Sequence, residues 1–189
     1  MNDDFLDIAI TKAECITGKN IRLRNAKPSD ADFIVKIRTD EKKSRFISAT
    51  SSDTSKQKNW LENYSTSEGQ AYFIITTLDN QPLGTVRMYD QQGDSFCWGS
   101  WVISEDAPSY CAIESSLLVY LYAIELGFKR AHFDVRKGNL SVIKFHERFG
   151  AELTGETDED FLYTISKEKI ILMLDKYKKH LPDKVEIFR

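Results

Sequence analysis

A histidine and an asparagine in one helical segment are the residues whose types and spacing most clearly suggest chemistry. Asn139 can cap the start of a helix, and His146 lies further along it. An imidazole with a pKa near its reference value of about 6.5 can accept a proton from an ammonium or donate one to a thiolate near neutral pH. His146 also has the spacing to pack with Val142 and Phe149 on one helix face. The sequence leaves both a catalytic role and a packing role open.

A second candidate is the start of an earlier helix. Apolar residues recur at helical spacing from Ile113 to Phe128, and Gly127 is a typical terminating glycine. The amides of Cys111 to Ser115 would point outward at the positive end of the helix dipole, which favours a phosphate. Every crossover helix has such an end, so this observation alone also fits an ordinary structural helix.

A third group of candidates combines cationic and aromatic side chains upstream of that helix. Arginine can bind a phosphate through two hydrogen bonds, and aromatic rings can stack on a base or a sugar. Each residue could equally be a surface charge or a core aromatic. The candidate substrate-binding residues are Arg38, Trp60, Arg87, Tyr89 and Trp98.

Other kinds of chemistry have less support. Cys15, Cys97 and Cys111 are an odd number at wide spacing, which suits neither a disulfide framework nor a zinc site, so free thiols and no metal are expected. Cys111 has no evident partner histidine that would make it a nucleophile, and no Gly-x-Ser-x-Gly elbow is present. A net charge of −3 without a basic stripe interleaved with aromatics argues against a nucleic-acid partner.

The candidate residues are positioned by a predicted series of strands and helices. A Ser-, Thr-, Asn- and Lys-rich stretch over 44–67, with a short helix at about 56–64, is a natural place for a segment that covers a substrate. The glycine inside the strand at 96–103 predicts a bulge or a close approach. That strand, the next helix and the strand at 131–135 form a βαβ unit, whose strands should be parallel and whose crossover should be right-handed. The other predicted elements are strands at 21–24, 72–77, 83–89, 151–156 and 160–165, a helix after Asp30, a helix after Asn139, and a last amphipathic helix carrying Ile170, Leu174, Tyr177 and Leu181.

Length and composition predict one globular domain in an aqueous compartment. The chain has 189 residues, of which 41% are hydrophobic and 29% charged. No apolar run approaches the roughly 20 residues that a spanning helix needs, so no membrane partner is expected. The first residues carry acids where a signal peptide needs bases, which predicts a cytoplasmic protein.

The stretch from Trp98 to Leu153 resembles the core of the GNAT N-acetyltransferase superfamily. The family's closing motif has the form Asn-x-x-x-(apolar)-x-(apolar)-Tyr-Glu-(Lys/Arg)-x-Gly-Phe. A looser resemblance extends from Ile21 to Ile165. The matching positions here are Asn139, Ile143, Phe145, His146, Glu147, Arg148, Gly150 and Ala151.

The resemblance implies an α/β (α+β) fold with a mixed, mostly antiparallel twisted sheet and flanking helices. A V-shaped split would separate the strand at 98–103 from the strand at 131–135. It further implies an N-terminal extension over residues 1–20, the acyltransferase domain over 21–166, and a C-terminal helical extension over 167–189 packed on the same domain.

The resemblance also implies transfer of an acetyl group from acetyl-CoA to a primary amine by direct attack. A strand amide would hold the thioester oxygen, and His146 would stand where the family often has the tyrosine that protonates the leaving thiolate. The pantetheine arm would lie in the split. The implied cofactor-binding residues are Trp101, Val102, Ile103, Ser109, Tyr110, Cys111, Ala112, Ile113, Glu114, Ser115 and Asn139.

The phosphate loop departs from the family pattern, and the acceptor is open. The usual (Gln/Arg)-x-x-Gly-x-(Gly/Ala) is replaced by Ser109, Ala112 and Glu114, and a carboxylate there would repel phosphates unless it turned away. The preferred acceptor is a small molecule, the amino group of a nucleotide-linked sugar. Alternatives are a protein N-terminus, a non-catalytic acyl-CoA-binding module, and an interaction protein that uses its C-terminal helix; a homodimer is also open.

Overall fold

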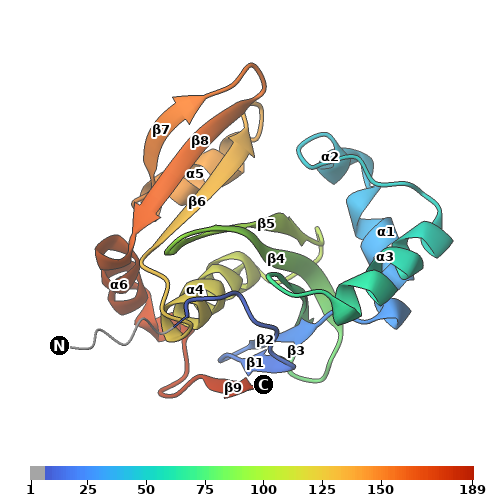
Figure 1. The fold of residues 1–189 in the computed structure, drawn as a ribbon, viewed down its shortest axis with the longest axis horizontal. Helices are drawn as coiled ribbons and strands as arrows, with labels where there is room; N and C mark the ends of the chain where they lie inside the picture. The colour runs from blue at the N-terminus through green and yellow to red at the C-terminus, as the bar shows by residue number, and fades with distance from the viewer. Residues whose placement is uncertain (1–6) are drawn as a thin grey trace.

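Residues 7–189, the part of the chain that this computed structural model describes, form one nine-stranded sheet. The strands are β1 (Cys15–Thr17), β2 (Ile21–Asn25), β3 (Ala71–Thr77), β4 (Pro82–Gln92), β5 (Ser95–Ile103), β6 (Arg130–Arg136), β7 (Glu152–Glu156), β8 (Asp160–Ser166) and β9 (Glu186–Phe188). Their order across the sheet is β7-β8-β6-β5-β4-β3-β2-β1-β9 (Figure 1). All neighbours are antiparallel except β5 and β6, which are parallel as the βαβ unit predicts.

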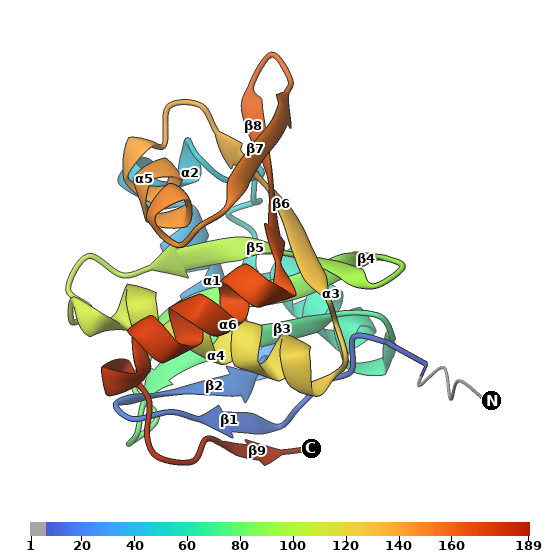
Figure 2. The ribbon, with the colours of Figure 1, turned by 90° about the vertical axis from the view of Figure 1, so that its left-hand side faces the viewer.

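Helices cover both faces of the sheet (Figure 2). Helix α4 (Tyr110–Glu125) and α6 (Lys167–Lys176) lie on one face, over a core that includes Phe73, Phe96 and Tyr120. Helix α1 (Ala31–Arg38) and α3 (Thr54–Thr66) lie on the other face, over a smaller cluster around Tyr64 and Tyr72. The remaining short elements are α2 (Glu41–Ser44), α5 (Leu140–Arg148) and the 3-10 turns η1 (Pro28–Asp30) and η2 (Lys178–His180).

The sheet opens where β5 and β6 separate. These strands pair only at their first residues, up to the partners Cys97 and His132. Beyond that pair, β6 stays with β8 and β7 while β5 stays with β4, and Figure 1 shows the two groups running apart. This is the V-shaped split that the family resemblance implied, and it exposes the edge of β5 toward β6.

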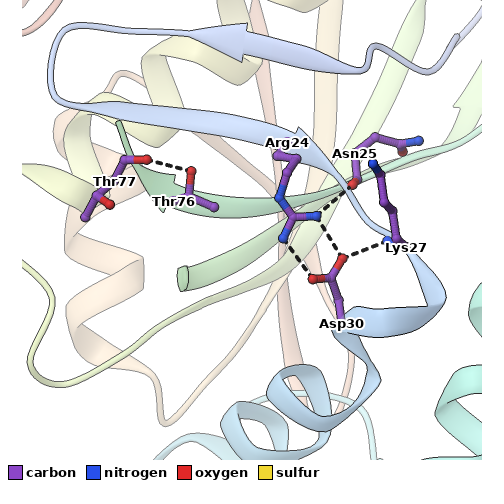
Figure 3. A network of polar contacts seen from close by, with 6 residues as sticks. All are labelled: Arg24, Asn25, Lys27, Asp30, Thr76 and Thr77. Carbon is purple, nitrogen blue, oxygen red and sulfur yellow. Dashed lines mark hydrogen bonds and ion pairs between the residues drawn. The ribbon is translucent and has the colours of Figure 1, made fainter. Parts of the chain in front are cut away.

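Helix α1 is fixed to the sheet by an ion pair next to its first turn (Figure 3). Arg24 of β2 contacts both carboxylate oxygens of Asp30, at 2.8 and 3.0 Å, and that carboxylate also accepts from the amide of Lys27 at 2.7 Å. Burial of the pair and this bidentate geometry strengthen it relative to an exposed ion pair. The anchor places Arg38, the last residue of α1, above the face of β4 and β5.

The two ends of the chain differ from the sequence-based expectation. Strands β1 and β9 were not predicted, and they pair with each other at one edge of the sheet. Helix α6 ends at Lys176, so Tyr177 and Leu181 lie beyond it. Residues 1–20 and 167–189 therefore both add strands to the main sheet, although residues 1–6 lie outside the described part.

No helix in the described residues is both long enough and apolar enough to span a membrane. All three cysteines are free thiols, as predicted.

Candidate active site

Three cavities follow one another across the split and share residues at their junctions. The β5–α4 cavity, of about 510 Å³, lies between the end of β5, the start of α4 and the start of α5. The split cavity, of about 200 Å³, lies between β5 and β6 and shares Trp101 and Asn139 with the first. The α1–α3 cavity, of about 290 Å³, shares Arg38 and Ser100 with the split cavity. Two ligands, one entering through the β5–α4 cavity and the other through the α1–α3 cavity, would meet in the split cavity.

The end of β5 forms one wall of the β5–α4 cavity through Trp101, Val102 and Ile103. The amide of Ser104 donates to the carbonyl of Leu83 on β4 at 2.8 Å. Because peptide groups alternate along an antiparallel ladder, the peptide of Val102 also faces β4 and that of Ile103 faces the split. Ile103 can therefore offer main-chain contacts to a ligand, whereas Val102 offers only its side chain.

Only part of the expected phosphate segment reaches this cavity. Ser109 and Ala112 line it. The side chain of Cys111 is fully buried, and Ser115 is buried while its hydroxyl accepts from the indole of Trp101 at 3.1 Å. Tyr110 and Ile113 pack against the main core instead. The first-turn amides of α4 still carry the positive end of the helix dipole at this wall.

Glu114 was predicted to bind the cofactor, but its carboxylate turns away from the cavity, which is the condition under which it would not repel phosphates. The side chain is fully buried and accepts hydrogen bonds from the amide of Asn20 at 2.7 Å, from its side chain at 3.0 Å, and from the amide of Ile21 at 3.2 Å. It thus ties α4 to the start of β2. The turned-away carboxylate removes the repulsion that a phosphate near α4 would otherwise meet.

Asn139 lines both the β5–α4 cavity and the split cavity. It occupies the N-cap position of α5, but its side chain makes no capping hydrogen bond. Its oxygen instead accepts from the hydroxyl of Ser141 at 3.4 Å, a long contact that leaves the amide group available to a ligand. Asn139 therefore stands at the N-cap position that the sequence predicted, but its side chain does not cap α5 by a hydrogen bond.

His146 lines the split cavity from α5 and is almost completely buried. Its ring lies among aromatic rings, with centroids 4.2 Å from Phe133 and 5.2 Å from Trp98. Its Nδ1 has no hydrogen-bond partner among the described residues. Burial lowers the pKa of His146 from 6.5 to about 3, so the imidazole is neutral near neutral pH.

A bulge in β5 lies directly beneath the split cavity. Thr85 pairs with Val102 but Arg87 pairs with Gly99, so β5 holds one extra residue there. Ser100 has φ of 46°, in the left-handed region, and its carbonyl accepts from the hydroxyl of Thr85 at 2.7 Å. The bulge expected near the glycine of this strand is confirmed, one residue beyond Gly99.

Tyr89 fills the space left by Gly99. A Cβ atom at Gly99 would lie 3.0 Å from the hydroxyl of Tyr89. Burial raises the pKa of Tyr89, so its hydroxyl stays protonated in the split cavity. Trp98 also lines this cavity, with its indole donating to Tyr120 at 3.2 Å.

The α1–α3 cavity is lined by cations and by no carboxylate. Arg38 is buried and donates to the hydroxyls of Thr50 at 2.6 Å and Ser48 at 2.8 Å. Arg87 donates twice to the side-chain oxygen of Gln70, at 2.6 and 3.0 Å. Neither guanidinium forms an ion pair within residues 7–189, and Lys56 adds a third cation. The cavity therefore favours an anion.

Aromatic rings surround the second of these arginines. The guanidinium of Arg87 lies 5.2 Å from the ring of Trp60 and 4.6 Å from that of Tyr89. Burial lowers the pKa of Arg87, and the charge of Arg38 lowers it further. Trp60 is held by a parallel stack on Tyr64 and an edge contact with Tyr72, and it remains 37% exposed. A partly exposed, fixed indole beside buried cations can stack on a planar ring.

The structure therefore brings together all the predicted substrate residues and His146, and part of the predicted cofactor set. Sequence reasoning missed several lining residues. Residues 46–51 were predicted only as part of a longer segment that could cover the substrate. The alternation of side chains along β6 could have indicated that Asp134 faces the split. The missed residues include Phe46, Ile47, Ser48, Thr50, Lys56, Tyr72, Ser100, Phe133 and Asp134.

Comparisons with known proteins identify the family. The sequence matches the model of the acetyltransferase (GNAT) domain over residues 20–152. It is similar in structure to apo FdhC, described as a nucleotide-linked sugar GNAT, with 38% identity and a TM-score of 0.80 over 88% of this chain and 97% of that one. No curated protein sequence matches this chain.

More distant solved structures share the fold. A GCN5-related N-acetyltransferase from Brucella melitensis has 15% identity and a TM-score of 0.75, over 92% of this chain and 87% of that one. A putative acetyltransferase from T. thermophilus has 18% identity and a TM-score of 0.73, over 89% of this chain and 97% of that one. The domain match and the relative at 38% identity together show that the chain belongs to the GNAT family and is an acyl-CoA-dependent N-acetyltransferase.

Proposed function

We propose that this enzyme transfers the acetyl group of acetyl-CoA to the primary amine of a nucleotide-linked amino sugar. The observation that carries this proposal is the α1–α3 cavity, where Arg38, Lys56 and Arg87 surround a space without a carboxylate. A diphosphate matches such a set, because guanidinium groups bind phosphate oxygens through charge-assisted hydrogen bonds. The similarity to a nucleotide-linked sugar GNAT at 38% identity supports the same acceptor class.

The shape of the site supports the nucleotide half of the acceptor. Trp60 borders the cation-lined cavity and is 37% exposed, so its indole can contact a base or a sugar. Arg38 and Ser100 border both this cavity and the split, so a ligand held by its phosphates would extend toward β5. A protein N-terminus, the alternative acceptor, needs no cluster of buried cations.

The residues of the β5–α4 cavity fit acetyl-CoA. A narrow pantetheine arm matches a cavity lined by Val102, Ile103 and Phe145, with Asn139 at its inner end. The dipole of α4 and the nearby Lys43 supply positive potential for the phosphates without a glycine in the loop, whereas Lys42 is paired with Glu105 of the same cavity. Acetyl-CoA bound there would supply the activated acetyl group.

The chain's own residues would then orient the reactants. The peptide of Ile103 and the side chain of Asn139 would hold the arm, and Arg38 and Arg87 would hold the acceptor. His146 would remain neutral, so it would act as a hydrogen-bond donor or acceptor toward the sulfur and not as an imidazolium acid. The aromatic rings around it would exclude water from the split.

Binding and turnover test this proposal separately. Calorimetric titration with acetyl-CoA should give saturable binding, and thiol release from acetyl-CoA should depend on an added UDP- or dTDP-linked amino sugar. Mass spectrometry should find one acetyl group on the sugar nitrogen. Binding of acetyl-CoA without turnover of any amine would favour the non-catalytic alternative, and faster turnover of peptides with free N-termini would favour the protein-amine alternative.

A further inference from the structure

The acceptor amine needs a group that removes its proton, and neither His146 nor the cations of the α1–α3 cavity supply one. An alkyl ammonium has no free electron pair, so it must be deprotonated before the nitrogen can attack a thioester. His146 is buried among aromatic rings on the side of the sheet that carries α4. The positively charged residues of the α1–α3 cavity would repel an ammonium rather than bind it.

We propose that Asp134 of β6 binds the ammonium of the acceptor in the split cavity and takes the proton that frees the nitrogen for attack. The inference rests on the proposed function for the acceptor's path through the cavities. It otherwise requires only that the acceptor be an amine, as the family's chemistry does.

The strand register places Asp134 at the point where the split opens. Cys97 and His132 are the last partners between β5 and β6. Two residues further along the same face stand Gly99 on β5 and Asp134 on β6. On this face Asp134 is the first side chain of β6 beyond the last pair, and Tyr89 occupies the space beside Gly99 in the same cavity. Asp134 is exposed and lines the split cavity.

Alternation across the sheet also sets the side from which Asp134 is reached. Arg87 pairs with both Tyr72 on β3 and Gly99 on β5, so all three lie on the face that carries α1 and α3. Asp134 shares that face through its register with Gly99. The neighbouring Phe133 points to the opposite face, where it contacts His146. An acceptor arriving from the α1–α3 cavity therefore meets Asp134 before it meets His146.

Asp134 is the carboxylate of this cavity that has no partner. The split cavity is lined by two carboxylates, Asp134 and Asp160. Asp160 forms an ion pair with Arg136 at 2.9 Å. No hydrogen bond or ion pair joins the side chain of Asp134 to another residue in the described part of the chain. Tyr89 lines the same cavity as Asp134.

With Asp134 as the base, every proton of the acetyl-transfer step is accounted for. The acceptor ammonium gives one proton to the Asp134 carboxylate and becomes a neutral amine. Its nitrogen forms a bond to the thioester carbonyl carbon as the carbon–sulfur bond breaks. A second proton from the nitrogen passes to the leaving sulfur, and Asp134 returns its proton to solvent. The products are the amide, the free thiol of coenzyme A and one proton.

Two nucleophiles of different protonation state test the role directly. Methylamine is cationic near neutral pH, whereas hydroxylamine is already neutral and needs no base. Asp134→Asn should lower kcat/KM for methylamine by about 10²- to 10⁴-fold, the range of general base catalysis, and should leave kcat/KM for hydroxylamine unchanged. Asp134→Glu should recover part of the methylamine activity. Asp90→Asn is the matched control, because Asp90 is an exposed carboxylate of β4 that pairs with His132 and lines none of the three cavities.

A binding measurement tests whether Asp134 binds the acceptor ammonium, and it does not require turnover. In the presence of coenzyme A, the wild type should bind a nucleotide-linked amino sugar more tightly than the same compound with a hydroxyl in place of the amine. Asp134→Asn should abolish that difference.

Equal loss with methylamine and hydroxylamine, or no loss with methylamine, would overturn the proposal. The methylamine arm contains no nucleotide, so it can succeed even if nucleotide-linked sugars prove not to be acceptors. In that case the proposed acceptor fails and the role of Asp134 stands.

Discussion

The α1–α3 cavity and the β5–α4 cavity would recognise two phosphate-bearing ligands by different means. The first uses Arg38, Lys56 and Arg87. The second relies on main-chain groups at the end of β5 and the start of α4, with lysines at its rim and with Ser109 and Ala112 in place of glycines. Under the proposed function, the helix dipole would bind the phosphates of the cofactor without glycines, whereas the acceptor would be recognised by dedicated cationic side chains.

Removing the two arginines should have the largest effect and should be confined to the acceptor. Each charge-assisted hydrogen bond contributes about 1.5–3 kcal/mol, so Arg38→Gln with Arg87→Gln should lower kcat/KM for a nucleotide-linked amino sugar by about 10²- to 10⁴-fold. Affinity for acetyl-CoA, measured by calorimetry, should not change.

Two further variants control this experiment. Arg87→Gln alone keeps the contacts of Arg38 to Ser48 and Thr50, which separates lost charge from altered packing. Arg45→Gln removes an arginine that stacks on Phe46 and lines none of the three cavities, and it should behave as the wild type. If the double variant lost the same factor in kcat/KM for an amino sugar without a nucleotide, the two arginines would not act on the nucleotide, and the contrast between the two cavities would be wrong.

Truncating Glu114 should affect stability but not the cofactor. Glu114→Ala leaves the amides of Asn20 and Ile21 without their acceptor. Unpaired buried donors cost about 1–3 kcal/mol each, so the free energy of unfolding should fall by about 2–6 kcal/mol. Urea denaturation measures this change. Glu105→Ala, which removes only an exposed pair with Lys42, should cost less than about 1 kcal/mol. A marked change in acetyl-CoA affinity of Glu114→Ala would return Glu114 to the cofactor site.

The buried imidazole between the two cavities should make stability depend on pH. The unfolded chain protonates His146 below about 6.5, but the folded chain does so only near a pKa of about 3. The unfolded state therefore binds the extra proton, and folding loses about 1.4 kcal/mol per pH unit as the pH falls within that window. His146→Phe should remove this slope relative to the wild type, while His132 and His180 remain in both proteins. Parallel stability curves between the two proteins would contradict the burial argument.

Restoring a glycine in the phosphate segment should have the smallest effect. Ala112→Gly should lower the free energy of unfolding by about 0.5–1 kcal/mol, the usual cost of glycine in a helix. If the cavity already admits the cofactor, its affinity for acetyl-CoA should remain nearly constant in the same titration. A large gain in affinity would mean that the methyl group of Ala112 limits the approach of the phosphates.

Local patterns predicted the donor side of the molecule better than the acceptor side. The spacing around Asn139 and His146 and the βαβ unit lie within one continuous stretch, so their periodicity predicted α4, β6 and α5. Strands β1 and β9 are three residues each, too short to show alternation, and their pairing depends on the opposite end of the chain.

The acceptor side depends on contacts between distant segments. Arg38, Trp60 and Arg87 were identified by residue type, but only the fold shows that α1, α3 and β4 bring them to one cavity. The contacts of Glu114 and the position of Asp134 in the split cavity were not predicted either. Alternation along β6 sets the face on which Asp134 lies, but only the fold shows that this face borders the split. Likewise, only the fold shows that the Glu114 side chain turns to the start of β2.

The ratio of kcat/KM for a nucleotide-linked amino sugar to that for the same amino sugar without the nucleotide tests the central claim most directly. It is measured by thiol release from acetyl-CoA with the wild-type enzyme. We expect the nucleotide-linked form to be preferred by about 10²-fold or more, since the cations of the α1–α3 cavity act only on its phosphates. A ratio near unity, or a preference for the free sugar, would contradict the assignment of that cavity to the acceptor.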